Sequence, residues 1–224
     1  MDTEDTIVAV ASPHDVGGLR GIVRLSGDGT LATVRKCFHS LEHESWEQVH
    51  SATRIPGTLT VRPPIGDIAC DLYLWPTAKS YTRQPTAELH TLGAPPLLHA
   101  IVETMCTHGA RLAGPGEFTL RAFLAGRIDL AQAEAVLGVI DAVNEREMNV
   151  ALTQLAGGLS QPLDQVRNTL LNLCADLEAG LDFVDEDIEF VSQQQVELAL
   201  AEAATTIAQA QQSMQLRNHT AQLP

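Results

Sequence analysis

The sequence has little positive charge. Its 224 residues include 14 lysines and arginines against 28 aspartates and glutamates, which gives a net charge of −14. The lysines are Lys36 and Lys79 alone. Because binding to a phosphate backbone needs clustered positive charge, broad nucleic-acid contact by this chain is not expected. If a nucleic acid is the ultimate substrate, the contact must be local, or made by a partner or a further segment.

The sequence also lacks long apolar runs and paired cysteines. No apolar run reaches the roughly 18 residues that suggest a membrane span, so no membrane contact is predicted. The acidic N-terminus argues against a signal peptide. The cysteines are widely spaced and form no CxxC pair, so neither a zinc site nor a disulfide framework is predicted. A chain without a disulfide framework suits a reducing compartment, and we therefore expect a cytoplasmic location. The cysteines are Cys37, Cys70, Cys106 and Cys174.

Signatures of catalysis are missing as well. No G-x-x-x-x-G-K-[ST] loop occurs, so no phosphate cradle is predicted. No paired carboxylates, nucleophile–base pair or oxyanion motif stands out, and the chain is not expected to perform chemistry by itself. Four histidines lack metal-ligand spacing and are interpreted as loop or surface residues: His14, His90, His99 and His108.

The sequence pattern divides the chain into two parts near residue 120. The first part alternates short β-branched runs with turns, whereas glycine and proline become sparse after residue 128. The predicted class is α+β, a mixed N-terminal domain followed by an all-α helical bundle segment. Strands are predicted at 6–11, 21–26, 58–61, 68–75 and 87–92, helices at 30–38, 95–106, 129–142, 145–155, 162–181 and 192–217, and a loop at 41–56.

Local signals mark several helix ends. Gly114-Pro115-Gly116 predicts a turn before a short helix over 118–124. Asp129 followed by Gln132 predicts a capping box, and Ser192 with Gln195 repeats it. Within 162–181, apolar residues step by three or four and form a single stripe, interpreted as core packing. The stripe consists of Leu163, Val166, Leu170, Leu173 and Leu177.

Residues 115–135, reading PGEFTLRAFLAGRIDLAQAEA, strongly resemble the P-G-E-F-[ST]-x-R-A-F-x-x-G-[KR]-x-D-L-x-Q-A-E-A signature of the tRNA modification GTPase MnmE family, also called TrmE. The segments 5–9 (DTIVA), 17–27 (GGLRGIVRLSG) and 181–188 (LDFVDEDI) resemble further motifs of that family. The resemblance covers nearly the whole chain.

The resemblance implies a tetrahydrofolate-binding and dimerisation domain at 1–120 and the first part of the helical domain at 121–224. Its implied ligand is 5-formyl- or 5,10-methylene-tetrahydrofolate. GTP, Mg²⁺ and K⁺ would bind only through a GTPase domain that this sequence lacks, so the chain is expected to be a fragment or a natural truncation. The implied partners are a second copy, an FAD-dependent MnmG-type protein, and tRNA whose wobble uridine is modified.

Three residues match the family's folate contacts by motif: Arg24, Glu88 and Arg127. A carboxylate can accept two hydrogen bonds from the pterin 2-amino/N3 edge, and arginines suit the glutamate tail and the formyl oxygen. Each residue also has a simpler interpretation. Arg24 and Glu88, on two strands, can pair with each other, and Arg127, before a capped helix, can be a plain surface residue.

The loop beside Glu88 departs from the family pattern S-[FY]-T-G-E-D-V-x-E-[IL]-x-x-H-G-G. Arg83-Gln84-Pro85 replaces Gly-Glu-Asp, and Leu92-Gly93-Ala94 replaces His-Gly-Gly. Arginine adopts positive φ less readily than glycine, and proline removes an amide donor.

Two interpretations stay open: a folate-binding and dimerising part of a tRNA modification GTPase, or a divergent dimerisation or partner-binding module. A stand-alone folate-dependent methyltransferase fits less well, because the helical half resembles MnmE.

Overall fold

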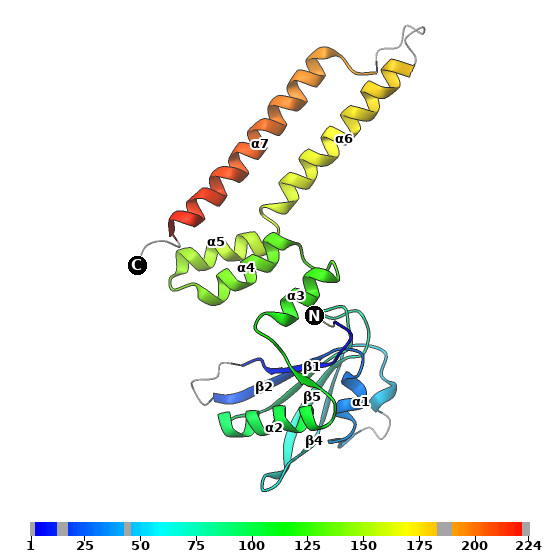
Figure 1. Cartoon of the computed structure of the whole chain (residues 1–224), viewed down its shortest axis with the longest axis vertical. Helices are drawn as coiled ribbons and strands as arrows, with labels where there is room; N and C mark the ends of the chain where they lie inside the picture. Colours follow the sequence, from blue (N-terminus) through cyan, green and yellow to red (C-terminus); the bar gives the residue numbers. More distant parts are fainter. Residues whose placement is uncertain (1–2, 13–17, 43–45, 183–189, 221–224) are drawn as a thin grey trace. The chain divides into compact units, whose positions relative to one another are not determined.

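A computed structural model describes residues 3–12, 18–42, 46–182 and 190–220. The chain forms two compact units, Met1–Ile128 and Asp129–Pro224, referred to below as the N-terminal unit and the helical unit (Figure 1). The division lies a few residues beyond residue 120, because the helix that spans residue 120 is bound to the N-terminal unit. The structure therefore has the α+β and then helical organisation that the sequence predicts.

The described residues of the N-terminal unit form a seven-stranded sheet in the order β3-β4-β5-β6-β2-β1-β7. Neighbouring strands are antiparallel except for β1 and β7, which are parallel. The strands are β1 Ile7–Val10, β2 Gly18–Ser26, β3 Phe38–Ser40, β4 Thr53–Val61, β5 Gly66–Trp75, β6 Thr86–Gly93 and β7 Arg111–Leu112. The helices of this unit are α1 Thr30–Val34, η1 Trp46–Gln48, α2 Pro95–Thr107 and α3 Glu117–Leu124.

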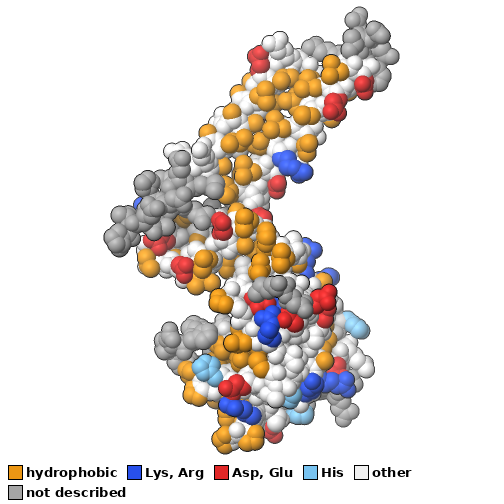
Figure 2. All heavy atoms as spheres, in the orientation of Figure 1, with side chains coloured by type: hydrophobic (Ala, Val, Ile, Leu, Met, Phe, Trp, Pro, Cys, Tyr) orange, Lys and Arg blue, Asp and Glu red, His pale blue; other side chains and the backbone are white. Residues whose placement is uncertain are grey.

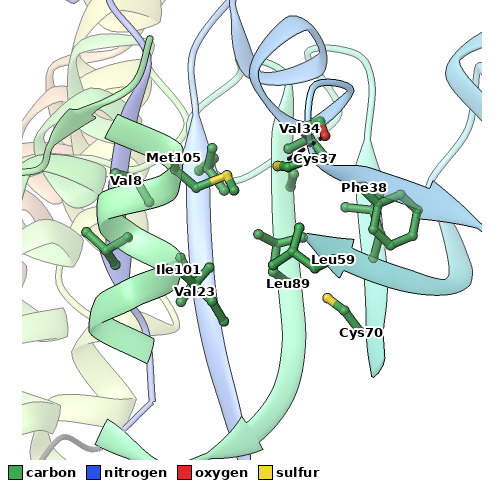
Figure 3. Packing of buried hydrophobic residues seen from close by; sticks show 14 of the residues in the cluster. Val8, Val23, Val34, Cys37, Phe38, Leu59, Cys70, Leu89, Ile101 and Met105 are labelled. Carbon is green, nitrogen blue, oxygen red and sulfur yellow. Dashed lines mark hydrogen bonds between the residues drawn. The ribbon is translucent and has the colours of Figure 1, made fainter. Parts of the chain in front are cut away.

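Alternating side chains give the sheet one apolar and one polar face, since successive strand residues point to opposite sides. Val23, Leu72 and Leu89 lie on the apolar face and are fully buried. Helix α2 packs against this face through Ile101 and Met105 (Figure 3). The other face carries half-buried polar residues, and the candidate site lies on it.

The predicted loop at 41–56 is wrong in part, because it contains η1 and the start of β4. The Pro56-Gly57 pair reads as a strand breaker, yet both residues lie within β4. A side chain at Gly57 would meet the Phe38 ring at 2.4 Å, so glycine lets β3 approach β4 closely. Helix α1 ends at Val34, earlier than predicted, because the chain then turns into β3.

The helical unit contains α4 Leu130–Asp141, α5 Glu145–Leu155, α6 Ser160–Asp182 and α7 Gln193–Thr220. The predicted capping box at α4 is confirmed: Gln132 N donates to Asp129 Oδ1 at 2.8 Å, and Asp129 N donates to Gln132 Oε1 at 3.1 Å. The bond from Gln195 N to Ser192 Oγ confirms the cap of α7. The acidic run at 182–189 lies almost wholly outside the described residues.

Two glutamines join α4 to α5. Gln132 Nε2 donates to the Leu155 carbonyl at 3.0 Å, and Gln154 Nε2 donates to the Ala131 carbonyl at 2.8 Å. Each glutamine thus binds backbone of the other helix. These reciprocal bonds fix the antiparallel α4–α5 pair at one of its ends.

The apolar stripe on α6 is incompletely covered. Helix α7 packs beside α6 and contributes Ile207 to an open apolar groove that Leu163, Val166 and Leu170 line. Hydrophobic side chains gather along this helix pair in the space-filling view (Figure 2). Leu163 and Leu177 of the stripe remain 38% and 43% exposed, and no described residue of α6 is buried. The interpretation of the stripe as core packing is therefore only partly realised within this chain.

Candidate functional site

The polar face of the sheet brings three residues into one row across neighbouring strands. Arg24 of β2 lies opposite Glu88 of β6, and Glu88 lies opposite Tyr73 of β5. Both neighbours of each residue point to the apolar face and are buried, as Val23 and Leu25 illustrate for Arg24. The strand period of two therefore places a guanidinium, a carboxylate and a phenol side by side.

Arg24 and Glu88 form a direct ion pair. Arg24 Nε donates to Glu88 Oε1 at 2.8 Å, and Nη2 lies 2.7 Å from the same oxygen. The side chains are 35% and 15% exposed, so both remain accessible from one side. The guanidinium also lies 5.8 Å from the centre of the Phe118 ring of α3, within the range of a cation–π contact. The structure thus brings together two of the three predicted site residues.

The second oxygen of Glu88 contacts His90. His90 Nε2 lies 2.9 Å from Glu88 Oε2, and its ring packs on Tyr73 with centroids 4.3 Å apart. Burial raises the pKa of Glu88, but the hydrogen bond from His90 and the charge of Arg24 outweigh it, so the pKa lies below its ordinary value. Glu88 is therefore an ionised acceptor at neutral pH.

His90 was missed as a site residue. Its interpretation as a loop or surface residue is wrong, because it lies in β6 with an 11% exposed side chain. A signal was available: Glu88 and His90 are two residues apart in a strand, so they share a face. Tyr73 and Arg20 were missed too, and Arg20 Nη2 lies 3.3 Å from the Tyr73 hydroxyl at the edge of this face.

Arg127 lies elsewhere in the N-terminal unit. It follows α3, its N–H donates to the Ala122 carbonyl at 2.8 Å, and its side chain is exposed. Over the described ranges, no hydrogen bond or ion pair joins this side chain to Arg24 or Glu88. The simpler interpretation of Arg127 as a surface arginine therefore stands beside the ligand role that the motif implies.

The altered loop packs on α3. Arg83 adopts φ +56°, the only positive φ among the described non-glycine residues. Its Nη2 donates to the carbonyl of Gly126, beside Arg127, at 3.3 Å. Tyr81 contacts Thr119 through their hydroxyls at 3.3 Å. The arginine thus occupies the conformation that suits glycine and adds a link to the end of the helix.

Pro85 contributes to the loop through its carbonyl oxygen. That oxygen accepts hydrogen bonds from Gly27 N and Thr30 Oγ1, each at 3.1 Å. The missing amide of proline therefore removes none of the bonds that fix the loop to the turn after β2.

An ionic cluster with a buried centre holds α3 to the sheet: Asp5, Arg111, Glu117 and Arg121. Glu117 Oε1 lies 2.7 Å from Arg111 Nη2 and 3.0 Å from Arg121 Nη2. Glu117 is 2% and Arg121 3% exposed. The hydrogen bond from Arg111, helped by Gly114 N–H and Arg121, lowers the pKa of Glu117 to about 2 despite its burial. Asp5 completes the cluster by accepting from both arginines.

Two further features define the chemistry of the described part of the chain. None of its helices is long and apolar enough to cross a membrane. Its His, Cys, Asp and Glu residues form no group of three or more that is arranged to hold a metal ion. The polar face presents hydrogen-bonding and charged side chains, among them Arg24, Glu88 and His90.

Comparison with known families divides the chain in the same way as its contacts do. Residues 6–127 match the family described as GTP-binding protein TrmE N-terminus, and residues 130–221 match the MnmE helical domain. Together the two families account for nearly the whole chain.

Curated relatives named tRNA modification GTPase MnmE are clearly similar. The protein of Rhodopirellula baltica is 51% identical over 191 residues, which cover 85% of this chain and 40% of that protein. The protein of Thermus thermophilus is 37% identical over 217 residues, 95% of this chain and 49% of that protein. That of Koribacter versatilis is 38% identical over 214 residues, with 93% and 45% covered. The chain spans less than half the length of these relatives.

Proposed function

Because the chain belongs to the MnmE family of tRNA modification GTPases and comprises its N-terminal and helical domains, we propose that it binds a reduced folate on the polar face of its sheet. The ligand is 5-formyl- or 5,10-methylene-tetrahydrofolate, which supplies a one-carbon unit. The N-terminal unit is the folate-binding and dimerisation domain, and residues 129–224 are the first part of the helical domain.

The observation that supports this proposal is the half-buried Arg24–Glu88 pair. A carboxylate offers about four lone pairs, and Arg24 and His90 occupy one oxygen each. Arg24 approaches Oε1 with both Nε and Nη2, so the lone pair left open on Oε2 is the one that suits a donor of a pterin 2-amino/N3 edge. The lowered pKa of Glu88 keeps the carboxylate an acceptor, so the residues present fit this group.

The arginines supply positive charge to the same ligand. Arg24 keeps donors beyond those spent on Glu88, because a guanidinium carries five N–H groups. Arg127 is exposed and is assigned to the anionic tail or the formyl oxygen. A charge-assisted bond of this kind contributes about 1.5–3 kcal/mol.

The full-length enzyme sets the context of this site. Within it, this portion dimerises and works with an FAD-dependent MnmG-type protein in the cytoplasm to place a carboxymethylaminomethyl-type group on the wobble uridine of tRNA. GTP, Mg²⁺ and K⁺ belong to the GTPase domain, and no phosphate-loop motif occurs in this sequence.

A second candidate is a divergent dimerisation or partner-binding module without folate. The rebuilt loop favours it, since Arg83 replaces glycine and joins the loop to the end of α3. Such a module would retain the fold and lose the ligand.

Titration of 5-formyltetrahydrofolate into the purified chain, followed by calorimetry, tests the proposal. Saturable binding is expected, weakened about tenfold or more by Arg24→Ala and by Glu88→Ala, where each tenfold step is about 1.4 kcal/mol. Arg62→Ala is the matched control, because Arg62 pairs with Glu103 of α2, on the opposite face of the sheet. Equal affinity in wild type and both site variants would place the ligand elsewhere. A wild-type chain that dimerises without binding would favour the second candidate.

A further inference from the structure

Glu88 is held from two sides. Oε1 accepts from Arg24 at 2.8 Å, and Oε2 contacts His90 Nε2 at 2.9 Å. The guanidinium and the imidazole thereby occupy different oxygens of one carboxylate. Both Glu88 and His90 are more than four-fifths buried, so these contacts are poorly screened by water.

The His90 ring is itself fixed. It packs against the Tyr73 ring at 4.3 Å and an interplanar angle of 37°. Its Nδ1 atom is buried and has no hydrogen-bond partner within the described part of the chain. Because an ionised carboxylate only accepts hydrogen bonds, Nε2 is the ring nitrogen that donates to Glu88.

We propose that His90 is a positioning residue for Glu88 in the proposed folate site. Its Nε2–H fixes the carboxylate plane, and this prevents Glu88 from turning both oxygens toward Arg24 in a bidentate pair. The lone pair of Oε2 that His90 leaves open is then available to the ligand. This inference rests on the proposed function and adds a residue that acts through Glu88 without touching the ligand.

Two variants separate the hydrogen bond from the packing. His90→Leu fills the space without a donor, whereas His90→Gln retains an N–H donor at a reach similar to that of Nε2. His90→Leu is expected to weaken 5-formyltetrahydrofolate binding about tenfold, and His90→Gln to restore affinity to within about threefold of wild type. His99→Leu, on the exposed side of α2, is the matched control and should leave affinity unchanged.

A double-variant comparison shows whether His90 acts through Glu88. If it does, Glu88→Ala with His90→Leu binds no more weakly than Glu88→Ala alone, because the effects of coupled residues are not additive. Additive losses would mean that His90 contacts the ligand or only supports the fold. Unchanged affinity in His90→Leu would overturn the inference while the proposed function stood.

A folate-independent measurement keeps the two proposals apart. Carboxyl-detected NMR titration follows the pKa of Glu88, which should rise in His90→Leu and stay low in His90→Gln. If the wild-type chain binds no folate but the pKa of Glu88 rises in His90→Leu, the proposed function is wrong and the hydrogen bond from His90 to Glu88 still stands. An unchanged Glu88 pKa in His90→Leu would overturn the inference.

Discussion

At the scale of the residue, the cluster around Glu117 shows how a helix can be fixed by charge as well as by apolar packing. A carboxylate that is 2% exposed lies between two guanidiniums, one of them 3% exposed. Removing one member of a buried ion pair is costly because it leaves the other charge uncompensated. Helix α3 carries Phe118 and precedes Arg127, so this cluster also sets the border of the candidate site.

Glu117→Gln should therefore destabilise the N-terminal unit by about 3–5 kcal/mol at pH 7. Urea unfolding measures the loss. Glu103→Gln is the control, because it removes one member of an exposed pair with Arg62 and should cost only about 0–1 kcal/mol. Similar losses in the two variants would contradict the role of burial.

The same carboxylate predicts a pH dependence. The folded-state pKa of Glu117 is lowered from 4.5 to about 2, so its contribution is fully present above its unfolded-state pKa. That contribution is lost as the pH falls from about 4.5 toward 2. The stability difference between wild type and Glu117→Gln should shrink across this window in urea titrations at stepwise lower pH. A constant difference would show that Glu117 does not titrate in this range.

Arg83 gives a second prediction for a single residue. Positive φ costs a non-glycine residue about 1–2 kcal/mol, whereas its exposed bond to Gly126 returns about 0.5–1.5 kcal/mol. Arg83→Gly should therefore be as stable as wild type, or more stable by up to about 1 kcal/mol. Arg83→Lys keeps the backbone strain and loses the guanidinium, so it should be the less stable variant in thermal unfolding. The reverse order would mean that the link to α3 outweighs the strain.

The candidate site was predictable only where its residues lie in recognisable motifs. Arg24 and Glu88 follow from the family resemblance, and their possible pairing follows from their placement on two strands. His90 could have been predicted from the rule that residues two apart in a strand share a face, which places it beside Glu88. The Glu117 cluster joins Asp5 to Arg121 across more than a hundred residues of chain, and no local pattern reveals such a contact.

At the scale of the element, local chemistry predicts the helices better than the sheet. Helix α5 has the predicted bounds, and the caps of α4 and α7 form as their sequences indicate. Strands β3 and β7 were missed because they are only three and two residues long. Their pairing depends on strands distant in sequence, and a short segment carries too few residues to show a period.

Asp129 offers a prediction at this scale. Asp129→Ala removes the side-chain acceptor for Gln132 N and should destabilise the helical unit by about 1 kcal/mol. Thermal unfolding followed by the helical circular dichroism signal measures the change. Asp164→Ala, an exposed position within α6, is the matched control and should shift stability by less than about 0.5 kcal/mol. An equal effect at both positions would argue against a capping contribution.

At the scale of the whole molecule, each of the two units is a candidate for self-association. The N-terminal unit is the proposed dimerisation domain, and the helical unit exposes the incompletely covered stripe on α6. Burying one such apolar side chain contributes about 1.5–3 kcal/mol, so the stripe can drive assembly in place of the N-terminal unit. The division after Ile128 allows the surfaces to be separated without cutting α3.

A chain of residues 1–128 should remain a dimer in size-exclusion chromatography with light scattering. Its own hydrophobic core and the complete Glu117 cluster support independent folding. The full chain carrying Leu163→Gln and Leu170→Gln, two residues of the stripe that line the groove, serves as the comparison and should keep the same dimer. A monomer from residues 1–128 would mean that the helices drive association.

The distribution of aromatic residues gives the two units separate optical signals. Every tryptophan and tyrosine precedes Ile128, and residues 129–224 contain neither. Trp46 is buried edge-on against Phe38, with ring centroids 5.4 Å apart, so its emission should change when the N-terminal unit opens. Far-ultraviolet ellipticity, in contrast, is dominated by the long helices of the second unit. Two melting curves recorded on one unlabelled sample would therefore show whether the units unfold together or in succession.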